Sequence, residues 1–297
     1  MKPYKITFIY AYEGEEWSTP IALANEFKDR NWEVDFVSIG SNKTGHYHED
    51  NLKKWVDSKP KTDIVLFMDW GRFDSPLLNK ELVDAFWVQE SGDDPQNFDR
   101  NSPKASRFHL TLTPDYKCYN EYKMRGINVE WLTHFADTKI HYPREVEITH
   151  VAVSSRGRGK QCPSIDYLVD YYGEDTIVNK NVWDPNGHSE FLCSGHMIIQ
   201  ESRWKEITRR IFEGMACGKL VITDRLPFHT NIDSLLVENQ DIIYYDSIEE
   251  LASKVVYFQE NPKERELIAQ RGRQKVLNNH TQVQWVDKII EKWKDSQ

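Results

Sequence analysis

The chain has 297 residues, of which 39% are hydrophobic and 12% aromatic, so the composition excludes a disordered chain and allows one large domain or two ordinary ones. The formal net charge of −9 argues against a protein that binds nucleic acid through charge alone, although it does not exclude a local cleft lined by basic residues. No apolar run approaches the roughly 20 residues that a membrane-spanning helix needs.

Strand and helix patterns alternate along the first half of the chain. Short runs rich in β-branched and aromatic residues predict strands, and Thr19-Pro20 supplies the N-cap and first-turn residues of a helix. The run 64–68 is almost wholly apolar, which is typical of a parallel strand buried on both faces. The predicted strands are 5–10, 34–39, 64–68, 85–88, 108–112 and 129–132, and the predicted helices are 19–30, 52–58 and 115–124. This rhythm indicates a doubly wound parallel sheet.

A polar segment at 138–147, which contains Pro143, separates this half from a second one with the same rhythm. We therefore predict an α/β protein with domains at 1–143 and 144–280 and a C-terminal helix within 281–297. In the second half the predicted strands are 149–153, 176–178, 196–199, 220–223 and 242–245, and the predicted helices are 164–172, 206–217, 248–259, 262–278 and 283–294. Two such domains would face each other across a cleft, and ligands would bind beyond the carboxyl ends of the strands.

The segment 209–218, Arg-Arg-Ile-Phe-Glu-Gly-Met-Ala-Cys-Gly, resembles the C-terminal signature of group 1 glycosyltransferases. More narrowly, it resembles the CgeB-like (spore-maturation) branch, whose pattern is Arg-x-Phe-Glu-x-x-Ala-Cys-Gly. The stretch from Arg271-Gly272-Arg273 to Asn279-His280-Thr281 agrees with the family's ending, and the resemblance is strongest over 209–281. It implies the GT-B fold, with two Rossmann-like domains facing a cleft, an acceptor on the first, a nucleotide-sugar donor on the second and no obligatory metal. It also implies a C-terminal segment that packs back across the domains.

A nucleotide sugar carries a diphosphate, whose charges the protein must offset with cations and helix N-terminal N–H groups when no metal does so. Arg156, Arg158 and Lys160 lie in a glycine-containing loop after the first predicted strand of the second domain, where a phosphate would bind. The resemblance implies that one arginine and one lysine of this loop bind the diphosphate. The alternative is a solvated basic turn.

Glu213 lies on a predicted helix between apolar residues, where a carboxylate needs polar partners. The resemblance implies that Glu213 binds the ribose hydroxyls and that Arg210 faces the phosphates; surface positions on an amphipathic helix are the alternatives. Gly214 either lets the helix approach the ligand or packs the helix on the sheet. Eight residues before Glu213 the chain has Lys205, where many relatives have a glutamate. The chain therefore lacks the Glu-x7-Glu pair, and we do not assign it the retaining mechanism associated with that pair.

A transferase also activates or steers the acceptor hydroxyl, and in an inverting enzyme an Asp, Glu or His takes its proton. Asp93 and Asp94 follow a buried strand and His134 ends another, so these three are the candidate catalytic bases. Solvated turn carboxylates and a structural histidine are the alternatives. We expect no metal site, since the run His46-Tyr47-His48-Glu49 lacks further ligands at a fitting spacing.

The expected function is that of a metal-independent hexosyl- or pentosyltransferase, which moves a sugar from a UDP- or GDP-linked donor to an acceptor hydroxyl without a tightly bound cofactor. The acceptor is a small molecule, a glycan, a protein or a hydroxylated base of phage DNA, and the net charge disfavours nucleic acid. Four widely spaced cysteines predict reduced thiols and a cytoplasmic protein. The alternative is a non-catalytic nucleotide-sugar sensor or partner subunit that keeps the donor pocket.

Overall fold

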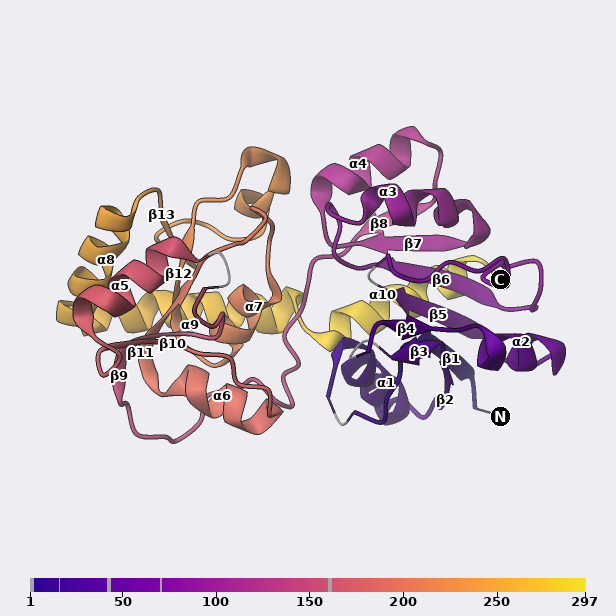
Figure 1. Cartoon of the computed structure of the whole chain (residues 1–297), viewed down its shortest axis with the longest axis horizontal. Helices are drawn as coiled ribbons and strands as arrows, with labels where there is room; N and C mark the ends of the chain where they lie inside the picture. Colours follow the sequence, from indigo (N-terminus) through magenta and orange to yellow (C-terminus); the bar gives the residue numbers. More distant parts are fainter. Residues whose placement is uncertain (1–2, 16, 42–43, 70, 160–161) are drawn as a thin grey trace. The chain divides into compact units, whose positions relative to one another are not determined.

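The computed structural model describes residues 3–15, 17–41, 44–69, 71–159 and 162–297. The chain divides into two compact units, Met1–Thr133 with Gln282–Gln297 and His134–Thr281 (Figure 1). The sequence predicts the change of domain at 143/144, whereas the contacts place it directly after Thr133. The segment 134–143 packs with the second unit, where the Ala136 N–H donates to the His280 carbonyl at 3.0 Å.

Parallel strands form the main sheet of the first unit, in the order β2-β1-β5-β6-β7-β8. Their bounds are β1 (Lys5–Tyr10), β2 (Glu33–Ser38), β5 (Ile64–Asp69), β6 (Phe86–Ser91), β7 (Leu110–Thr113) and β8 (Val129–Trp131). Every residue of β5 and β6 is buried, which explains why these strands show no alternation of polar and apolar residues. The other elements are α1 (Thr19–Asp29), β3 (Gly40–Ser41), β4 (His46–Tyr47), α2 (Asp50–Asp57), α3 (Phe98–Asn101), η1 (Ser102–Arg107) and α4 (Tyr116–Met124).

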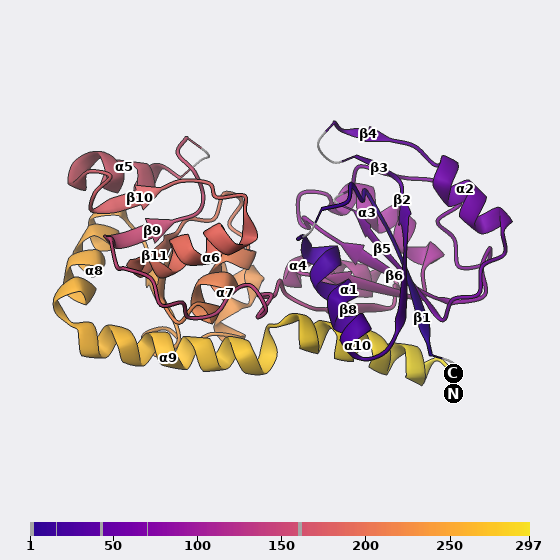
Figure 2. The ribbon, with the colours of Figure 1, turned by 90° about the horizontal axis from the view of Figure 1, so that it is seen from below.

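The C-terminal helix α10 (Gln282–Asp295) belongs to the first unit, where it packs beside α1 (Figure 2). Its apolar face is buried, and the Trp285 Nε1–H donates to the Thr133 carbonyl at 2.8 Å. Arg30, the C-cap residue of α1, forms ion pairs with Glu26 of α1 and with Asp287 of α10. The last helix therefore completes the core of the unit in which the chain begins.

The sheet of the second unit is also parallel, with the order β10-β9-β11-β12-β13. Its strands are β9 (His150–Ser154), β10 (Ile177–Asn179), β11 (Gly195–Gln200), β12 (Leu220–Asp224) and β13 (Ile243–Tyr245). After β9 the chain adds β10 on one side, and then crosses over to add β11 on the other. The strand order thus reverses between β9 and β11, and the carboxyl ends at such a point are where open α/β sheets bind ligands.

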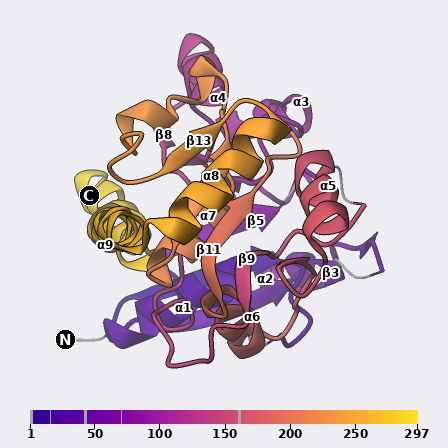
Figure 3. The ribbon, with the colours of Figure 1, turned by 90° about the vertical axis from the view of Figure 1, so that its left-hand side faces the viewer.

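Helices cover the second sheet, and Figure 3 looks onto this unit with α8 in front and α9 seen along its axis. α5 contacts α8, and α7 contacts α9. The elements are α5 (Pro163–Tyr172), α6 (Pro185–Cys193), α7 (Arg209–Ala216), η2 (Phe228–Thr230), η3 (Ile232–Ser234), α8 (Ile248–Glu260) and α9 (Pro262–Asn279). Helix α6, which has Asp184 as N-cap and Pro185 in its first turn, was not among the elements predicted from the sequence. The helix predicted over 206–217 starts later, at Arg209.

Candidate functional site

Helix α7 follows the loop after β11 and carries Arg209, Arg210, Glu213 and Gly214. Arg209 and Glu213 are four residues apart and share one face of the helix, so the Arg209 Nε lies 2.7 Å from the Glu213 Oε1. Gly214 lies toward the sheet, because a Cβ atom there would come within 2.8 Å of the Ile198 Cδ1. The close approach supports the packing alternative for Gly214, in which the missing side chain lets the helix pack on the sheet.

Glu213 is a buried carboxylate, with only 2% of its surface exposed. Burial by itself raises the pKa of this group, but Arg209, His141 and His188 outweigh burial and lower the pKa to about 2. Its Oε1 atom is fully buried and lies 2.7 Å from the Arg209 Nε. An ionised carboxylate can accept hydrogen bonds from the hydroxyl groups of a ligand.

Three histidines of the second unit surround this carboxylate. His141 Nε2 lies 3.1 Å from His188 Nδ1 on α6 and 3.9 Å from Glu213 Oε1. Burial lowers the pKa of His141 to about 4, against the opposing effect of Glu213. His134 is half-buried, and burial together with Arg209 lowers its pKa to about 4 as well. The His134 and His141 rings are therefore neutral at pH 7.

Positive charge gathers beside the same carboxylate. Arg156, which follows β9, is 8% exposed, and Arg210 is half-buried on α7. Burial lowers the pKa of Arg210 to about 10; Glu213 opposes this shift, while Arg156 and Arg209 add to it. No carboxylate of the described residues forms an ion pair with Arg210 within 4.0 Å. A bound anion would compensate these desolvated guanidinium groups.

The other predicted phosphate ligands of this loop are placed differently. Arg158 is exposed and forms ion pairs with Asp170 and Glu174, at the outer side of α5, so its charge is already neutralised. Lys160 lies outside the described residues. Gly157 has φ +77° and its N–H donates to the Asn179 Oδ1 at 2.8 Å, which fixes the turn that follows β9. Of the two described cationic candidates in the loop, Arg156 lies close enough to Arg210 to lower its pKa, whereas Arg158 pairs with carboxylates elsewhere.

A cavity of about 380 Å³ opens at the carboxyl ends of β11, β12 and β13. Glu201 forms part of its wall and accepts hydrogen bonds from the Ser164 N–H at 3.0 Å and the Ser164 Oγ at 3.1 Å, at the start of α5. Lys205 lies 2.7 Å from the Asp224 Oδ2 in another part of the wall. Cys162, two residues before Ser164, is hydrogen-bonded to the Arg156 side chain. The cavity and the arginines thus lie along one edge of one sheet.

The remaining predicted catalytic residues, Asp93 and Asp94, belong to the first unit, after β6. Asp94 is 2% exposed and accepts hydrogen bonds from Ser91 Oγ at 2.7 Å, Thr113 Oγ1 at 3.0 Å and Asn101 Nδ2 at 3.3 Å. Burial outweighs these donors and raises the pKa of Asp94 to about 6. Asp93 is half-buried with a left-handed backbone, φ +55°. The two carboxylates lie at the carboxyl end of their own sheet, in a different unit from Glu213.

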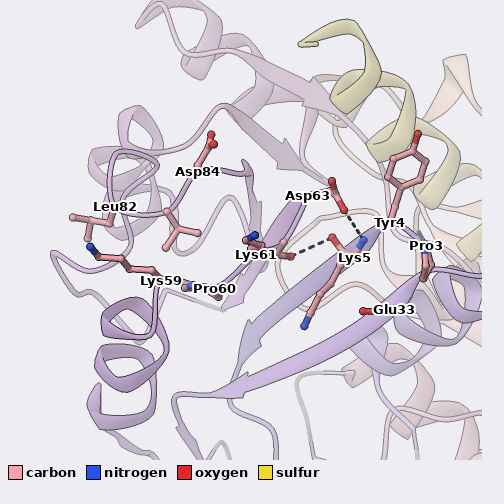
Figure 4. Close-up of a pocket in the computed structure, with 12 residues that line it drawn as sticks. Pro3, Tyr4, Lys5, Glu33, Lys59, Pro60, Lys61, Asp63, Leu82 and Asp84 are labelled. Atoms are coloured by element: carbon pink, nitrogen blue, oxygen red, sulfur yellow. Dashed lines mark hydrogen bonds between the residues drawn. The ribbon is translucent and has the colours of Figure 1, made fainter. Parts of the chain in front are cut away.

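A larger open cavity, of about 740 Å³, lies elsewhere on the first unit (Figure 4). It adjoins the amino ends of the strands, where the Lys5 N–H donates to the Asp63 Oδ2 at 2.7 Å and the Thr62 Oγ1 donates to the Lys5 carbonyl at 3.2 Å. Ligands of parallel sheets bind at the opposite edge. Cavity size therefore does not single out the functional site here.

His141, His188 and Glu213 also satisfy the elementary condition for a metal site, since their ligand atoms lie within 4.8 Å of one another. Glu213 Oε1, however, already pairs with Arg209, and Arg210 adds a second positive charge nearby. A divalent cation would have to displace one guanidinium group and lie beside another. We therefore interpret the three side chains as a packed polar group, in which the two histidines are hydrogen-bonded and Glu213 is close enough to interact through charge.

Sequence reasoning did not select Arg209, His141 or His188. Arg209 carries a local signal, because it lies four residues before Glu213 on the predicted helix. The two histidines carry none, since neither has a motif and both reach Glu213 only through the tertiary fold.

Residues 147–291, just under half of the chain, match the family model described as "Glycosyl transferase-like". Solved structures similar over almost the whole chain include a glycosyltransferase from Rickettsia africae, at 15% identity, TM-score 0.71 and 99% of each chain covered. Sucrose-phosphate synthase from Thermosynechococcus elongatus is 10% identical, with TM-score 0.69 and coverage of 99% of this chain and 100% of that one. HepE from Anabaena, in complex with UDP and glucose, is 13% identical, with TM-score 0.66 and coverage of 98% and 100%. These likenesses confirm the predicted fold class.

No curated protein matches the sequence. Among the helices of the described residues, none combines the length and the apolar character required to cross a membrane.

Proposed function

We propose a specific reaction for this glycosyltransferase of the GT-B fold: transfer of a hexosyl or pentosyl group from a UDP- or GDP-linked sugar to an acceptor hydroxyl. The observation that carries the proposal is the buried, anionic Glu213 beside two desolvated arginines at the carboxyl edge of one parallel sheet. A nucleoside diphosphate has the complementary pattern, with a hydroxyl-bearing ribose next to two phosphate groups.

In this proposal Glu213 accepts hydrogen bonds from the ribose hydroxyls through its Oε2 atom. Its depressed pKa supports this role, because a carboxylate that stays ionised is the stronger acceptor. The geometry supports it too, since Arg209 holds the other oxygen from inside the protein. In the proposed complex the ligand therefore meets an Oε2 atom of fixed orientation, while Arg209 compensates the charge on Oε1.

Arg156 and Arg210 bind the diphosphate in the proposed complex, with Lys160 of the same loop as a further candidate. A diphosphate that leaves with the nucleotide gains negative charge as the glycosidic bond breaks, and fixed guanidinium groups stabilise that charge. Such groups can carry out this task without a metal ion, which is why we propose metal-independent transfer. Arg158 is not part of this set, because two carboxylates of α5 and its following turn already compensate it.

The cavity of about 380 Å³ at the ends of β11 to β13 is the proposed site of the nucleobase. Its size is suited to a flat heterocycle, and Ser164 in its wall lies two residues after Cys162, which is hydrogen-bonded to the Arg156 side chain. The Anabaena HepE structure is in complex with UDP and glucose, which supports a uridine or a related nucleotide here.

We propose His134 as the catalytic base on the donor side, since it is neutral and lies near Arg209, Arg210 and Glu213. Asp93 and Asp94 are the proposed carboxylates on the acceptor side. Asp93 is the more accessible of the two, because the three hydrogen bonds to Asp94 already use most of its accepting capacity.

The finer assignments belong to the same proposal. The segment 209–218 supports the CgeB-like branch, and four cysteines that are free and buried support a cytoplasmic protein. The acceptor is a small molecule, a glycan, a protein or a hydroxylated base of phage DNA; the net charge of −9 disfavours the last.

The test is a thermal-shift panel of UDP, GDP and their sugars, followed by slow hydrolysis of the sugar that stabilises the protein. A ligand at 100 times its dissociation constant raises the free energy of unfolding by about 2.7 kcal/mol, which is readily measured. Stabilisation with hydrolysis supports a transferase. Stabilisation without hydrolysis indicates the alternative, a binding subunit that keeps the donor pocket, and no stabilisation by any member of the panel contradicts the proposal.

A further inference from the structure

His188, His141 and Glu213 form a chain of three buried side chains contributed by three separate parts of the second unit. His188 comes from α6, Glu213 from α7, and His141 from the segment that precedes β9. The exposed fraction is 6% for His188, 2% for Glu213 and 1% for His141. The side chains are thus packed in place, and their mutual distances are fixed by the fold of this unit.

The central atom of this chain is the Nε2 of His141, which faces both other groups. It lies 3.1 Å from His188 Nδ1, a hydrogen-bond distance, and 3.9 Å from Glu213 Oε1, a distance at which charge and dipole interact without a full hydrogen bond. A neutral imidazole carries its proton on one nitrogen only. A proton on Nε2 places partial positive charge near the carboxylate, whereas a lone pair there would repel it. The favoured tautomer therefore has the proton on Nε2, with His188 Nδ1 as its acceptor.

This arrangement gives Glu213 a second internal partner besides Arg209. Arg209 is about one-third exposed and lies next to the proposed diphosphate site, so a bound phosphate competes for its guanidinium group. His141 is buried, and nothing from solvent competes for it. When the ligand draws on Arg209, the His141 ring, held in place by His188, still packs beside Oε1 and limits the rotation of the carboxylate, so that Oε2 stays turned toward the ligand.

We infer that the His188–His141 pair positions Glu213 and thereby makes the donor site selective for ribonucleotides over 2′-deoxyribonucleotides. This inference rests on the proposed role of Glu213 at the ribose. A carboxylate in a fixed orientation can accept hydrogen bonds from two neighbouring hydroxyls, and a 2′-deoxyribose supplies only one of them. His141 and His188 are positioning residues in this scheme, because they act through Glu213 and do not touch the ligand.

The experiment compares the dissociation constants of UDP and 2′-deoxy-UDP, and of GDP and 2′-deoxy-GDP, by isothermal titration calorimetry. For each nucleotide that the wild-type protein binds, the ribo form should bind about tenfold more tightly, as expected for a hydrogen bond to a charged group. His141→Leu, which removes the N–H, should bring this ratio close to one by weakening the ribo form alone. His141→Gln offers an amide N–H in place of the Nε2 proton and should restore part of the ratio.

His188→Leu is the test of the outer residue and should also reduce the ratio. His196→Leu is the matched control, because His196 is exposed on β11 and belongs to no part of the site. If His141→Leu fails to fold, His141→Gln and His188→Leu still provide the comparison. Circular dichroism and the melting temperature identify a variant that has lost its structure.

The outcomes separate this inference from the proposed function. If the wild-type protein binds neither nucleotide, the proposed donor site is wrong. If it binds ribo and deoxy forms equally, the ribose role of Glu213 is wrong. If the wild-type ratio is large and His141→Leu leaves it unchanged, the positioning role is overturned while the donor site stands. A ratio that disappears when EDTA is added would also overturn it, in favour of a metal ion held by the three side chains.

Discussion

The Arg209 Nε and the Glu213 Oε1 lie 2.7 Å apart, one helical turn from each other on α7. This ion pair lets a carboxylate with 2% exposure stay ionised, because the nearby guanidinium compensates the cost of burial. The same pair orients the carboxylate, since it fixes one of its oxygens. The electrostatics of this buried group therefore depend on one local spacing in the sequence.

Replacing Arg209 with leucine should destabilise the second unit, because it leaves a buried carboxylate without its main cation. We expect a loss of roughly 1–3 kcal/mol in the free energy of unfolding, reduced from the value for a fully buried pair because Arg209 is about one-third exposed. Urea denaturation at neutral pH measures this loss, and Arg209→Lys is the control that keeps the charge. Equal stability of wild type and Arg209→Leu would show that the pair does not compensate Glu213.

Glu213→Gln should weaken the binding of UDP or GDP by about tenfold or more, because an amide oxygen without charge is a poorer acceptor for the ribose hydroxyls. The fold should persist, since glutamine has nearly the same shape. Calorimetric titration measures the binding, and the melting temperature serves as the control. A melting point that collapses together with unchanged affinity would assign Glu213 a purely structural role.

Arg210→Gln and Arg158→Gln form a matched pair of substitutions at two arginines near the same loop. Arg210 lacks an ion-pair partner among the described carboxylates. Its replacement should therefore weaken the binding of a nucleoside diphosphate by at least about tenfold, and should hardly change the binding of the bare nucleoside. Arg158 is already paired with Asp170 and Glu174, so its replacement should change neither affinity by more than about twofold. Equal effects of the two substitutions would contradict the assignment of the diphosphate to Arg210.

Acidification should destabilise the protein through its buried histidines. Burial lowers the pKa of His280 from 6.5 to about 4, so between these values the unfolded chain binds a proton that the folded protein does not. The free energy of unfolding should therefore fall as the pH falls through this window. In His280→Gln the free energy of unfolding should fall by roughly 2–3 kcal/mol less than in the wild-type protein across this window. Urea denaturation at several pH values measures the difference. Parallel curves for the two proteins would count against this linkage.

Trp285→Ala should unfold the first unit more easily, although the residue lies near the end of the sequence. Trp285 is 2% exposed, and its Nε1–H donates to the Thr133 carbonyl at 2.8 Å. Truncating a buried tryptophan costs about 3–5 kcal/mol, so the loss should be large. Limited proteolysis with peptide mapping shows which unit opens, and preferential cleavage within His134–Thr281 would disagree with the assignment of α10.

The sequence by itself determined the fold class and the alternation of strands and helices, and it selected Glu213 as a candidate site residue. Local information suffices for these features. The apolar run at 64–68 is typical of a strand buried on both faces, and the residues that resemble the family pattern are nearly consecutive within 209–218. The spacing of Arg209 and Glu213 also lies within one helical turn, so the pair was accessible from sequence even though it was not selected.

Tertiary structure alone decided which groups surround Glu213. His141 and His188 are remote from it in sequence, and only the packing of α6, α7 and the segment before β9 brings them together. The same holds for the two loop arginines. Arg156 and Arg158 lie two positions apart, and the sequence could not distinguish them, but the Arg156 side chain is buried whereas Arg158 pairs with Asp170 of α5. Local patterns fix backbone elements, whereas the direction and partners of a side chain depend on contacts that form between distant segments.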